Sequence, residues 1–347
     1  WIVLAEVSNI DVTSFEDTQT NIGFRYDYYV RVDTKSGNNV SSNQPVAEAG
    51  NFIKLNSAEE TDICLDTQNG IFYVTVYRQN KILLISASTF EKTDSIMLDN
   101  IPGKIALNNS FTKLYVIYTG GLKSFDVIDL ASKNIIHTAD LSSILVTSAR
   151  DIYMTTNGQL FVSGRYIVRI DESNNYAAQK VAGDRNFSDA RITFLGDDGQ
   201  FLYAEISTHS PNDLFKLDLS QAGVPLVLED AHGSVSATYK AQLSPDGSKL
   251  YMREGQIVRA SDFATAGNLT DKIYAVAVTS EKVFTCTAAR FATGSLNTIN
   301  AATLAIEKQQ EVGFLASTMI YYNNALFAIA ELGSSSGAWR FFKIDMN

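Results

Sequence analysis

Few residues of the types that perform chemistry occur in this sequence, and their spacing forms no local catalytic or metal motif. The three histidines, His137, His209 and His232, are far apart in the chain. A zinc site needs three or four nitrogen, sulfur or oxygen ligands, and no short segment supplies them. The sequence also lacks a Walker A loop, a G-x-G-x-x-G fingerprint and a C-x-x-C pair. We therefore expect no cofactor, no metal and no local catalytic motif.

Carboxylates are numerous, but their spacing does not single out a site. The segments 197–199 (Asp-Asp-Gly) and 244–247 (Ser-Pro-Asp-Gly) lack the alternating oxygen ligands and the late Glu of an EF-hand loop. We interpret both as hairpin turns. Paired carboxylates for glycoside chemistry stay open, because the two groups could come from distant repeats. With 38 acidic residues in the chain, the sequence does not single out one such pair.

The composition indicates a well-packed globular protein and argues against some classes of partner. Hydrophobic residues make up 45% and the net charge is −10. An acidic chain lacks the basic footprint that nucleic acid requires and is disfavoured at an anionic membrane surface. No run of about twenty apolar residues occurs, so we expect no membrane span. Cys64 and Cys286 fall in distant repeats, and we expect no disulfide between them.

An internal repeat organises most of the chain. A turn rich in Gly, Asn, Asp or Ser leads seven times into a short strand with an apolar–aromatic core. The seven cores are Phe72-Tyr73-Val74, Leu114-Tyr115-Val116, Leu160-Phe161-Val162, Leu202-Tyr203-Ala204, Leu250-Tyr251-Met252, Val283-Phe284-Thr285 and Leu326-Phe327-Ala328. From the first core to the last, the repeats are about 42 residues apart, the period of a four-stranded propeller blade.

A second marker recurs in phase with the first and predicts how the ring closes. Each core is followed by an alternating strand that ends in an apolar residue and a small polar one, as at Ile128-Asp129 and Ile344-Asp345. Only two residues follow Asp345, so the seventh blade lacks its outermost strand. The spare strand is 52–55, just before the first repeat. Pairing it with 339–344 would close the ring and remove an exposed edge.

One segment resembles a known family. Residues 243–251, Leu-Ser-Pro-Asp-Gly-Ser-Lys-Leu-Tyr, resemble the blade signature of YVTN/YncE-like and surface-layer propellers. The resemblance covers about residues 50–347. It implies an all-β fold, a seven-bladed β-propeller of four-stranded blades with N-terminal strand closure. It implies almost nothing about activity, because this superfamily includes binders, scaffolds and enzymes.

Residues 1–46 do not carry the blade pattern and form a separate predicted unit. We expect strands at 1–7, 13–16, 24–34 and 40–46. The run 23–32 resembles strand F of fibronectin type III domains, with Tyr26 at the tyrosine-corner position, whose hydroxyl bonds the upstream backbone. The resemblance covers only the C-terminal half of such a β-sandwich. We therefore predict a partial fibronectin type III-like domain at 1–46 and the propeller at 47–347. We also expect upstream sequence that supplies any signal peptide or lipid anchor.

The predicted blades place a set of Arg and aromatic residues on one face. This is the face where the second strand of each blade joins the third, and where each outer strand joins the next blade. Arg and aromatic side chains together are enriched in recognition hot spots, and Arg makes bidentate contacts to carboxylates. We expect this face to bind an anionic, sugar-like or peptide ligand. The candidate ligand-binding residues are Tyr77, Arg78, Tyr118, Arg150, Arg165, Arg185, His209, Arg290 and Phe291.

Three functions remain open at this point. The first is an extracytoplasmic binding or scaffolding module, on a bacterial surface or in the periplasm, that contacts a protein, peptide or glycan. The second is a propeller enzyme of the lactonase, lyase or hydrolase type, which a cluster of His, carboxylate and metal at the central channel would favour. The third is the sensor propeller of a larger signalling protein. The lack of a catalytic motif favours the first.

Overall fold

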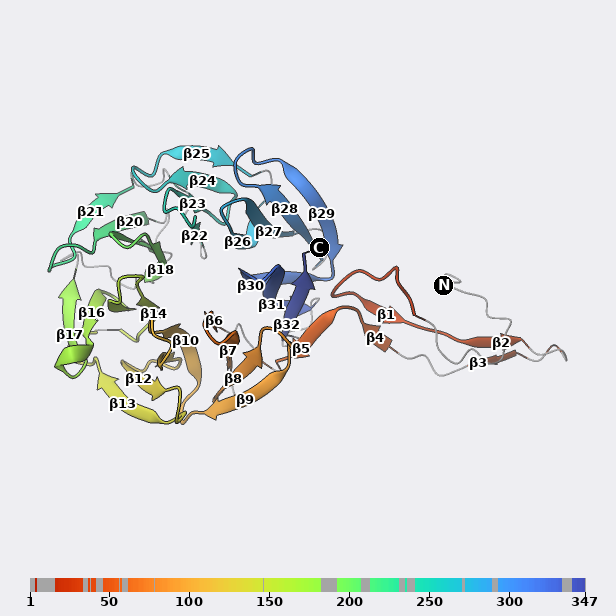
Figure 1. Cartoon of the computed structure of the whole chain (residues 1–347), viewed down its shortest axis with the longest axis horizontal. Helices are drawn as coiled ribbons and strands as arrows, with labels where there is room; N and C mark the ends of the chain where they lie inside the picture. The colour runs from red at the N-terminus through yellow and green to blue at the C-terminus, as the bar shows by residue number, and fades with distance from the viewer. Residues whose placement is uncertain are drawn as a thin grey trace.

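The computed structural model describes most of the chain. The described residues are 4, 16–33, 37, 39–41, 46–55, 57, 62–77, 79–145, 147–181, 192–206, 213–230, 235, 241–269, 272–288, 293–332 and 339–346. They form an all-β fold in which seven four-stranded antiparallel sheets are arranged as the blades of a ring (Figure 1). The predicted seven-bladed propeller is therefore confirmed.

In each of the first four blades, four consecutive strands run from the axis outward. Blade one contains β6 (Ile63–Asp66), β7 (Ile71–Val76), β8 (Lys81–Ser86) and β9 (Lys92–Met97). Blade two contains β10 (Pro102–Leu107), β11 (Lys113–Tyr118), β12 (Ser124–Asp129) and β13 (Ile135–Asp140). Blade three contains β14 (Asp151–Met154), β15 (Leu160–Ser163), β16 (Ile167–Asp171) and β17 (Ala177–Val181), with the 3₁₀ helix η1 (Glu172–Asn174) before its last strand. Blade four contains β18 (Ile192–Asp197), β19 (Phe201–Ile206), β20 (Asp213–Asp218) and β21 (Leu226–Glu229).

The last three blades continue the pattern until the chain ends. Blade five contains β22 (Gln242–Leu243), β23 (Lys249–Tyr251), β24 (Gln256–Arg259) and β25 (Thr265–Asn268). Blade six contains β26 (Ile273–Val278), β27 (Lys282–Ala288), β28 (Gly294–Asn300) and β29 (Ile306–Val312). Blade seven contains β30 (Phe314–Tyr322), β31 (Ala325–Leu332) and β32 (Trp339–Asp345), and its outermost strand is β5 (Asn51–Lys54).

The ring closes through the strand that precedes blade one, as predicted. β5 pairs antiparallel with β32, so that Phe341 lies opposite Ile53 and Phe342 opposite Phe52. Figure 1 shows β5 beside β32, where the first and last parts of the propeller meet. This pairing gives blade seven its fourth strand and satisfies a backbone edge that would otherwise be exposed.

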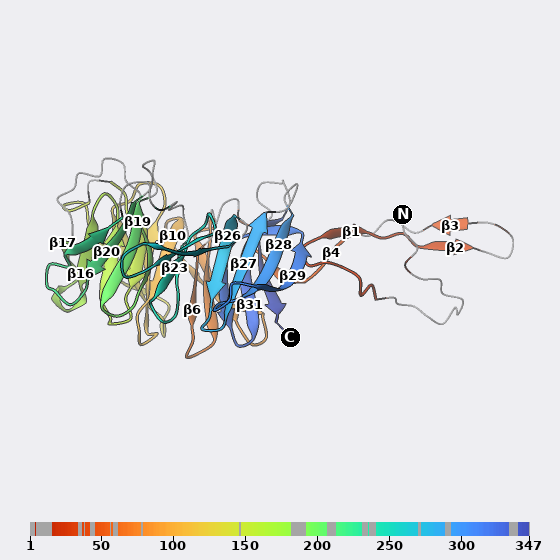
Figure 2. The same ribbon diagram turned by 90° about the horizontal axis from the view of Figure 1, so that it is seen from above.

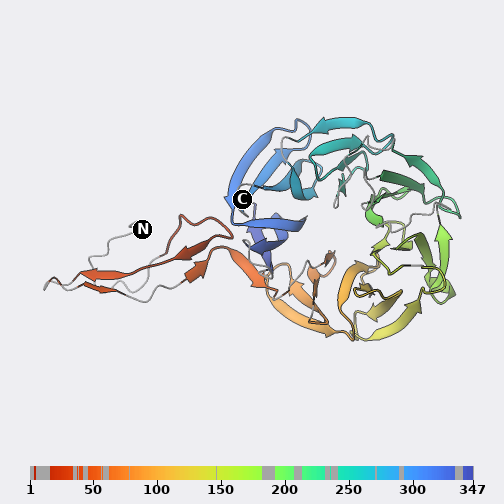
Figure 3. The same cartoon turned by 180° about the vertical axis from the view of Figure 1, so that it is seen from behind.

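The hydrophobic core is divided into clusters that lie between neighbouring blades. Among the described residues there are seven such clusters, one for each pair of adjacent blades. The cluster between blades seven and one includes Phe341 and Phe72, whose ring centroids are 5.2 Å apart. Alternate residues of each strand face opposite neighbours, which is why the second and third strands are buried on both sides. Figure 3 shows the resulting ring from behind.

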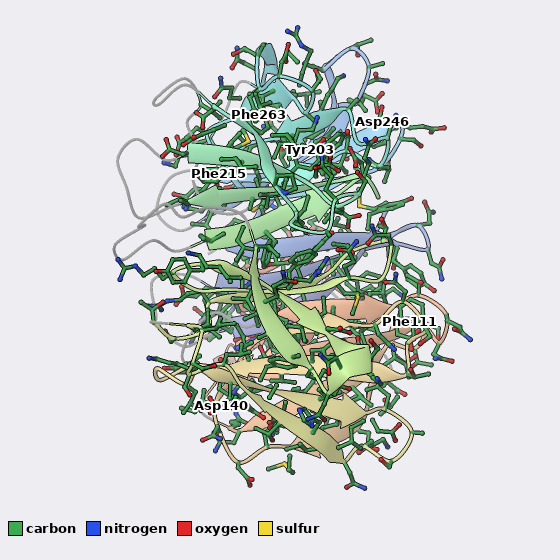
Figure 4. The ribbon with its side chains drawn as sticks, turned by 90° about the vertical axis from the view of Figure 1, so that its left-hand side faces the viewer. Phe111, Asp140, Tyr203, Phe215, Asp246 and Phe263 are labelled. Carbon is green, nitrogen blue, oxygen red and sulfur yellow. The ribbon has the colours of Figure 1, made fainter. Side chains whose placement is uncertain are left out.

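The ring has two distinct faces. On the face that we call the loop face, second strands join third strands and outer strands join the next blade. On the turn face, first strands join second strands. Figure 4 shows Asp140, at the end of β13, on one edge, and Phe111 and Asp246, which lie in turns before second strands, on the opposite edge. The Asp-Gly segments at 197–199 and 244–247 lie in turn-face hairpins, and Asp246 accepts a hydrogen bond from the Ser248 amide at 3.0 Å.

The described residues before β5 form an arm that leaves the ring at blade seven (Figure 2). β1 (Arg25–Asp27) pairs with β4 (Val46–Glu48), and β2 (Arg31–Asp33) pairs with β3 (Asn39–Ser41), both antiparallel. The strand predicted over 24–34 is therefore interrupted at Tyr28–Val30, and the strand predicted over 40–46 is divided between β3 and β4. The strands predicted at 1–7 and 13–16 lie outside the described residues, apart from Leu4 and Glu16, neither of which is in a strand. The predicted bond of Tyr26 is present, since the Asn21 amide donates to its hydroxyl oxygen at 2.8 Å.

Two contacts hold the base of the arm against blade seven. Arg340 of β32 forms a two-nitrogen ion pair with Glu48 of β4, with N–O distances of 3.2 Å. The Gly313 amide donates to the Ile22 carbonyl at 2.8 Å. A Cβ at Gly313 would lie 2.3 Å from the Gly23 carbonyl oxygen. Only glycine permits this close backbone approach.

Replacing a residue at the closure should destabilise the whole ring. Phe341→Ala removes a fully buried ring from the cluster between blades seven and one, and large-to-small core changes of this kind cost about 3–5 kcal/mol. We expect that loss in the free energy of unfolding measured by urea denaturation. The matched control is Ile136→Ala on an outer strand, where the side chain is 53% exposed and the loss should stay below about 0.5 kcal/mol. Equal losses in the two variants would contradict the closure.

A methyl group at the base of the arm should release the arm and leave the blades folded. Gly313→Ala places a Cβ against the backbone of Gly23, which cannot move aside as a flexible side chain could. We expect faster limited proteolysis within residues 16–48, mapped by mass spectrometry, with little change in the remaining fragments. Gly223→Ala is the control, because nothing lies within 4 Å of its added Cβ. Unchanged cleavage of the arm in Gly313→Ala would show that this contact does not hold it.

Candidate functional site at the loop face

The structure describes four of the nine predicted ligand-binding residues. Tyr77 follows β7 and is half-buried, Arg150 precedes β14 and is exposed, and Arg165 lies half-buried between β15 and β16. These three are on the loop face, where they were expected. The other predicted residues, Arg78, Arg185, His209, Arg290 and Phe291, lie outside the described residues.

The fourth residue, Tyr118, corrects the prediction. It was expected in a loop, but it is the last residue of β11 and only 3% exposed. Its hydroxyl donates to the Asp126 carboxylate, which also accepts from the Thr138 hydroxyl at 2.6 Å. Burial and this carboxylate raise the pKa of Tyr118 above its ordinary value. The side chain therefore stabilises the interior of blade two and offers no exposed contact to a ligand.

Charged residues that the sequence analysis did not select gather at the loop-face end of the inner strands. Three of them, Asp62, Lys104 and Asp151, hold the same position in their blades. Each comes directly before the inner-strand residue that pairs with the third residue of the apolar–aromatic core in the second strand. They therefore occupy the same level in blades one, two and three. The Lys104 ammonium pairs with the Asp62 carboxylate at 2.8 Å.

Two of these carboxylates connect neighbouring blades. Asp62 of blade one accepts a hydrogen bond from the Ile105 amide of blade two at 2.9 Å. Asp151 of blade three accepts from the Phe194 amide of blade four at the same distance. Ile105 and Phe194 hold equivalent positions in their strands, so the same clamp occurs twice. Burial raises the pKa of Asp151 to about 6, although Lys104 and the backbone bonds act in the opposite direction.

The next two blades contribute charges from their second strands. The residue after the three-residue core contacts the following blade, as when the Ser163 hydroxyl donates to the Ile192 carbonyl at 2.7 Å. In blade six, Cys286 accepts from the Ala316 amide of blade seven at 3.3 Å. From blade one to blade seven this position is occupied by Thr75, Ile117, Ser163, Glu205, Arg253, Cys286 and Ile329. Aligning the seven repeats would have revealed Glu205 and Arg253 as the two charged exceptions.

Glu205 is the least satisfied of these groups. The residue is 0% exposed, and neither carboxylate oxygen has a hydrogen-bond partner. Buried polar groups are paired in the great majority of cases, and a buried charge is costly unless it is compensated. Burial raises the pKa of Glu205 to about 7; Arg253 opposes this shift and Asp151 adds to it. Glu205 is therefore poised to hold or release a proton near neutral pH.

Arg253 lies close enough to influence Glu205 but is not paired with it. No ion pair within 4.0 Å joins these two described side chains. The Arg253 guanidinium lies over the Tyr274 ring of blade six, 5.1 Å from its centroid, and its Nε is buried without a hydrogen-bond partner. Cation–π contact partly compensates the positive charge of Arg253, and Glu205 is left without a direct hydrogen-bonded partner.

Together we call Asp62, Lys104, Asp151, Glu205 and Arg253 the loop-face charge cluster. It contains three carboxylates and two bases, so one negative charge is in excess when all are ionised. Such a cluster can bind a proton or a cation. Within the part of the chain that the structure describes, no group of three or more His, Cys, Asp or Glu is placed to hold a metal ion. The same part of the chain contains no helix with the length and hydropathy of a membrane span.

Comparison with known proteins identifies the fold and no family. No family model matches the chain, and no curated protein matches it. The structure is similar to a chain of hydrazine synthase from Kuenenia stuttgartiensis, with a TM-score of 0.63 and 12% identity over 82% of this chain and 96% of that one. It is also similar to the Cps50 (Swd1) β-propeller domain of Myceliophteria thermophila, with a TM-score of 0.64 and 11% identity over 84% of this chain and 98% of that one. Altogether 1362 solved chains match, so the likeness establishes a widely shared propeller fold.

The raised pKa of Glu205 should make stability fall as pH rises. An unfolded Glu ionises near 4.5, whereas folded Glu205 ionises near 7. Between these values the folded state holds a proton that the unfolded state has lost, so the free energy of unfolding decreases with pH. Glu205→Gln removes this term. Relative to the parent, we expect the variant to gain up to about 3 kcal/mol between pH 4.5 and pH 8, since one pKa unit is about 1.4 kcal/mol.

Urea denaturation at a series of pH values measures this effect. Asp151 contributes in the same direction at lower pH, because burial raises its pKa to about 6, and that contribution remains in Glu205→Gln. The matched control is Glu254→Gln, an exposed position directly after Arg253, which should keep the pH dependence of the parent. A difference between Glu205→Gln and parent that stays constant across the pH range would refute the assignment.

Proposed function

We propose that this chain is a binding module that takes a peptide or protein ligand at the loop face of its propeller. The observation that supports the proposal is Glu205, a fully buried carboxyl without a partner at the loop-face end of the second strand of blade four. Unpaired buried groups at a rigid, closed scaffold are a common sign of a functional position. Propellers offer such a position where loops from several blades converge.

Charges of both signs favour a peptide over a purely anionic ligand. The exposed Arg150 lies directly before Asp151, at the rim of the charge cluster, and Tyr77 is half-buried on the same face. Arg and Tyr anchor many protein interfaces, and Glu205 adds a site of negative charge further in. A peptide can present carboxylates to the rim and a basic side chain to the centre, which a neutral glycan cannot.

The same proposal includes the family of the propeller, its cellular location and the type of the N-terminal domain. We infer a YVTN/YncE-like propeller from the resemblance of residues 243–251, and an extracytoplasmic location on a bacterial surface or in the periplasm from that family association. We also infer a fibronectin type III-like domain of which residues 1–46 are the C-terminal part. The hairpin arm and the Tyr26 bond support it, because strands F and G of such a domain form a hairpin.

An enzyme is the second candidate, and one observation favours it. A carboxyl with a pKa of about 7 is suited to general acid–base catalysis at neutral pH. A hydrolase or lyase also needs a nucleophile or a second acid–base group within hydrogen-bond reach, and Glu205 has no hydrogen-bond partner. Turnover of a chromogenic ester, lactone or glycoside that is lost in Glu205→Gln would favour the enzyme.

Screening the full chain against peptide and glycan arrays tests the binding proposal. We expect peptide ligands, and we expect Arg150→Ala to weaken their binding about tenfold, since interface arginines that act as anchors commonly contribute about 1–2 kcal/mol. The readout is the dissociation constant by fluorescence anisotropy.

The control for this experiment is the same substitution on the opposite face. Arg259 ends β24 at the turn face, is exposed and pairs with Asp262 at 2.7 Å. Arg259→Ala should leave affinity unchanged. If every ligand from the arrays binds Arg150→Ala as well as parent, the loop face is not the binding surface.

A further inference from the structure

The charge balance of the loop-face charge cluster suggests what it would bind, if the proposed binding function is correct. Asp62 and Lys104 neutralise each other in an ion pair at 2.8 Å. Asp151 keeps its charge compensated in part by two backbone amides, of Ile152 and Phe194, each at 2.9 Å. Glu205 receives no hydrogen bond at all. The excess negative charge of the cluster is therefore located where donors are absent.

The position of Glu205 in the repeat explains why no donor reaches it. In blades three and six the equivalent side chain bonds the backbone of the next inner strand, through Ser163 and Cys286. Glu205 is longer and charged, and it makes no such bond to blade five. Neither base of the cluster pairs with it, because Lys104 is held by Asp62 and Arg253 lies over Tyr274.

Both carboxylate oxygens of Glu205 are buried without a hydrogen-bond partner, which favours one kind of cation. A guanidinium group carries parallel N–H donors that match the two oxygens of a carboxylate, and it is more weakly hydrated than an ammonium ion. A guanidinium group therefore loses less hydration free energy than an ammonium ion when it enters a buried position. Asp151, from the neighbouring inner strand β14, adds negative charge close to Glu205, and Arg253 limits the site to a single additional positive charge.

We propose that the loop-face charge cluster binds one organic monocation with at least two N–H donors, of the guanidinium type found in arginine side chains, on the carboxylate of Glu205. The bound cation replaces the proton that Glu205 otherwise holds. The O–H bond of the acid breaks, the proton goes to solvent, and both oxygens accept N–H bonds from the ligand. Glu205 is fully covered in the structure, so neighbouring side chains shift as the cation enters.

Small probes test this proposal with the least displacement of the protein. The experiment is isothermal titration calorimetry of the full chain with methylguanidinium, and with methylurea as a neutral probe of similar shape. Tetramethylammonium carries the charge without N–H donors, and potassium carries it without any donor geometry. We expect methylguanidinium to bind at least tenfold more tightly than each of the other three.

The exchange with a proton gives a second readout. Because ligand binding displaces one proton below pH 7, the dissociation constant of methylguanidinium should fall about tenfold per unit from pH 5 to pH 7 and level off above it. Glu205→Gln should abolish binding, and Glu254→Gln should bind as the parent does. Circular dichroism confirms that both variants are folded, and Glu205→Asp, which keeps the charge, should retain part of the affinity.

The outcomes separate this inference from the proposed function. If array peptides bind in an Arg150-dependent way but methylguanidinium does not bind, the cation site is wrong and the binding module stands. If methylguanidinium binds Glu205→Gln as tightly as the parent, the assignment to Glu205 is wrong. Equal binding of tetramethylammonium or potassium would overturn the requirement for N–H donors.

Discussion

The backbone pairing between β5 and β32 is the interaction on which the rest of the structure depends. Four residues on each side, Asn51–Lys54 and Arg340–Lys343, convert a chain of sheets into a closed ring. Every blade then has a neighbour on both sides, and each cluster of apolar side chains is shared between two blades. The members of the loop-face charge cluster come from five consecutive blades, and contacts such as the ion pair between Lys104 of blade two and Asp62 of blade one cross the interfaces between adjacent blades.

The closing strand also determines how the arm leaves the ring. β4 ends only three residues before β5 begins, and Glu48 of β4 pairs with Arg340 of β32. The Arg340 guanidinium also lies 5.6 Å from the centroid of the Phe52 ring in β5. One arginine therefore contacts both the closure and the arm. A substitution in the closing strand would therefore affect the arm as well as the blades.

A single repeated position illustrates how stability and function compete in this fold. At the residue after each second-strand core, five blades carry an apolar or small polar side chain, and two carry Glu205 and Arg253. The small side chains of Ser163 and Cys286 connect adjacent blades at little cost. Glu205 makes no such bond, and burial raises the pKa of its carboxyl group to about 7. Local departures of this kind are expected at functional positions. The similar solved propellers, at identities of 11% and 12%, share the fold alone.

The sequence by itself determined the repeat, the number of blades, the closing strand and the face to which Tyr77, Arg150 and Arg165 belong. It could do so because strand alternation and turn residues are local patterns that recur at a fixed period. Tyr118 was misplaced because a strand end cannot be told from a loop by pattern alone. Only the tertiary structure decided that the members of the loop-face charge cluster share one end of the ring. That information lies in the register between strands and in the packing of one blade on the next, where burial and the absence of a donor turn an ordinary glutamate into a candidate site.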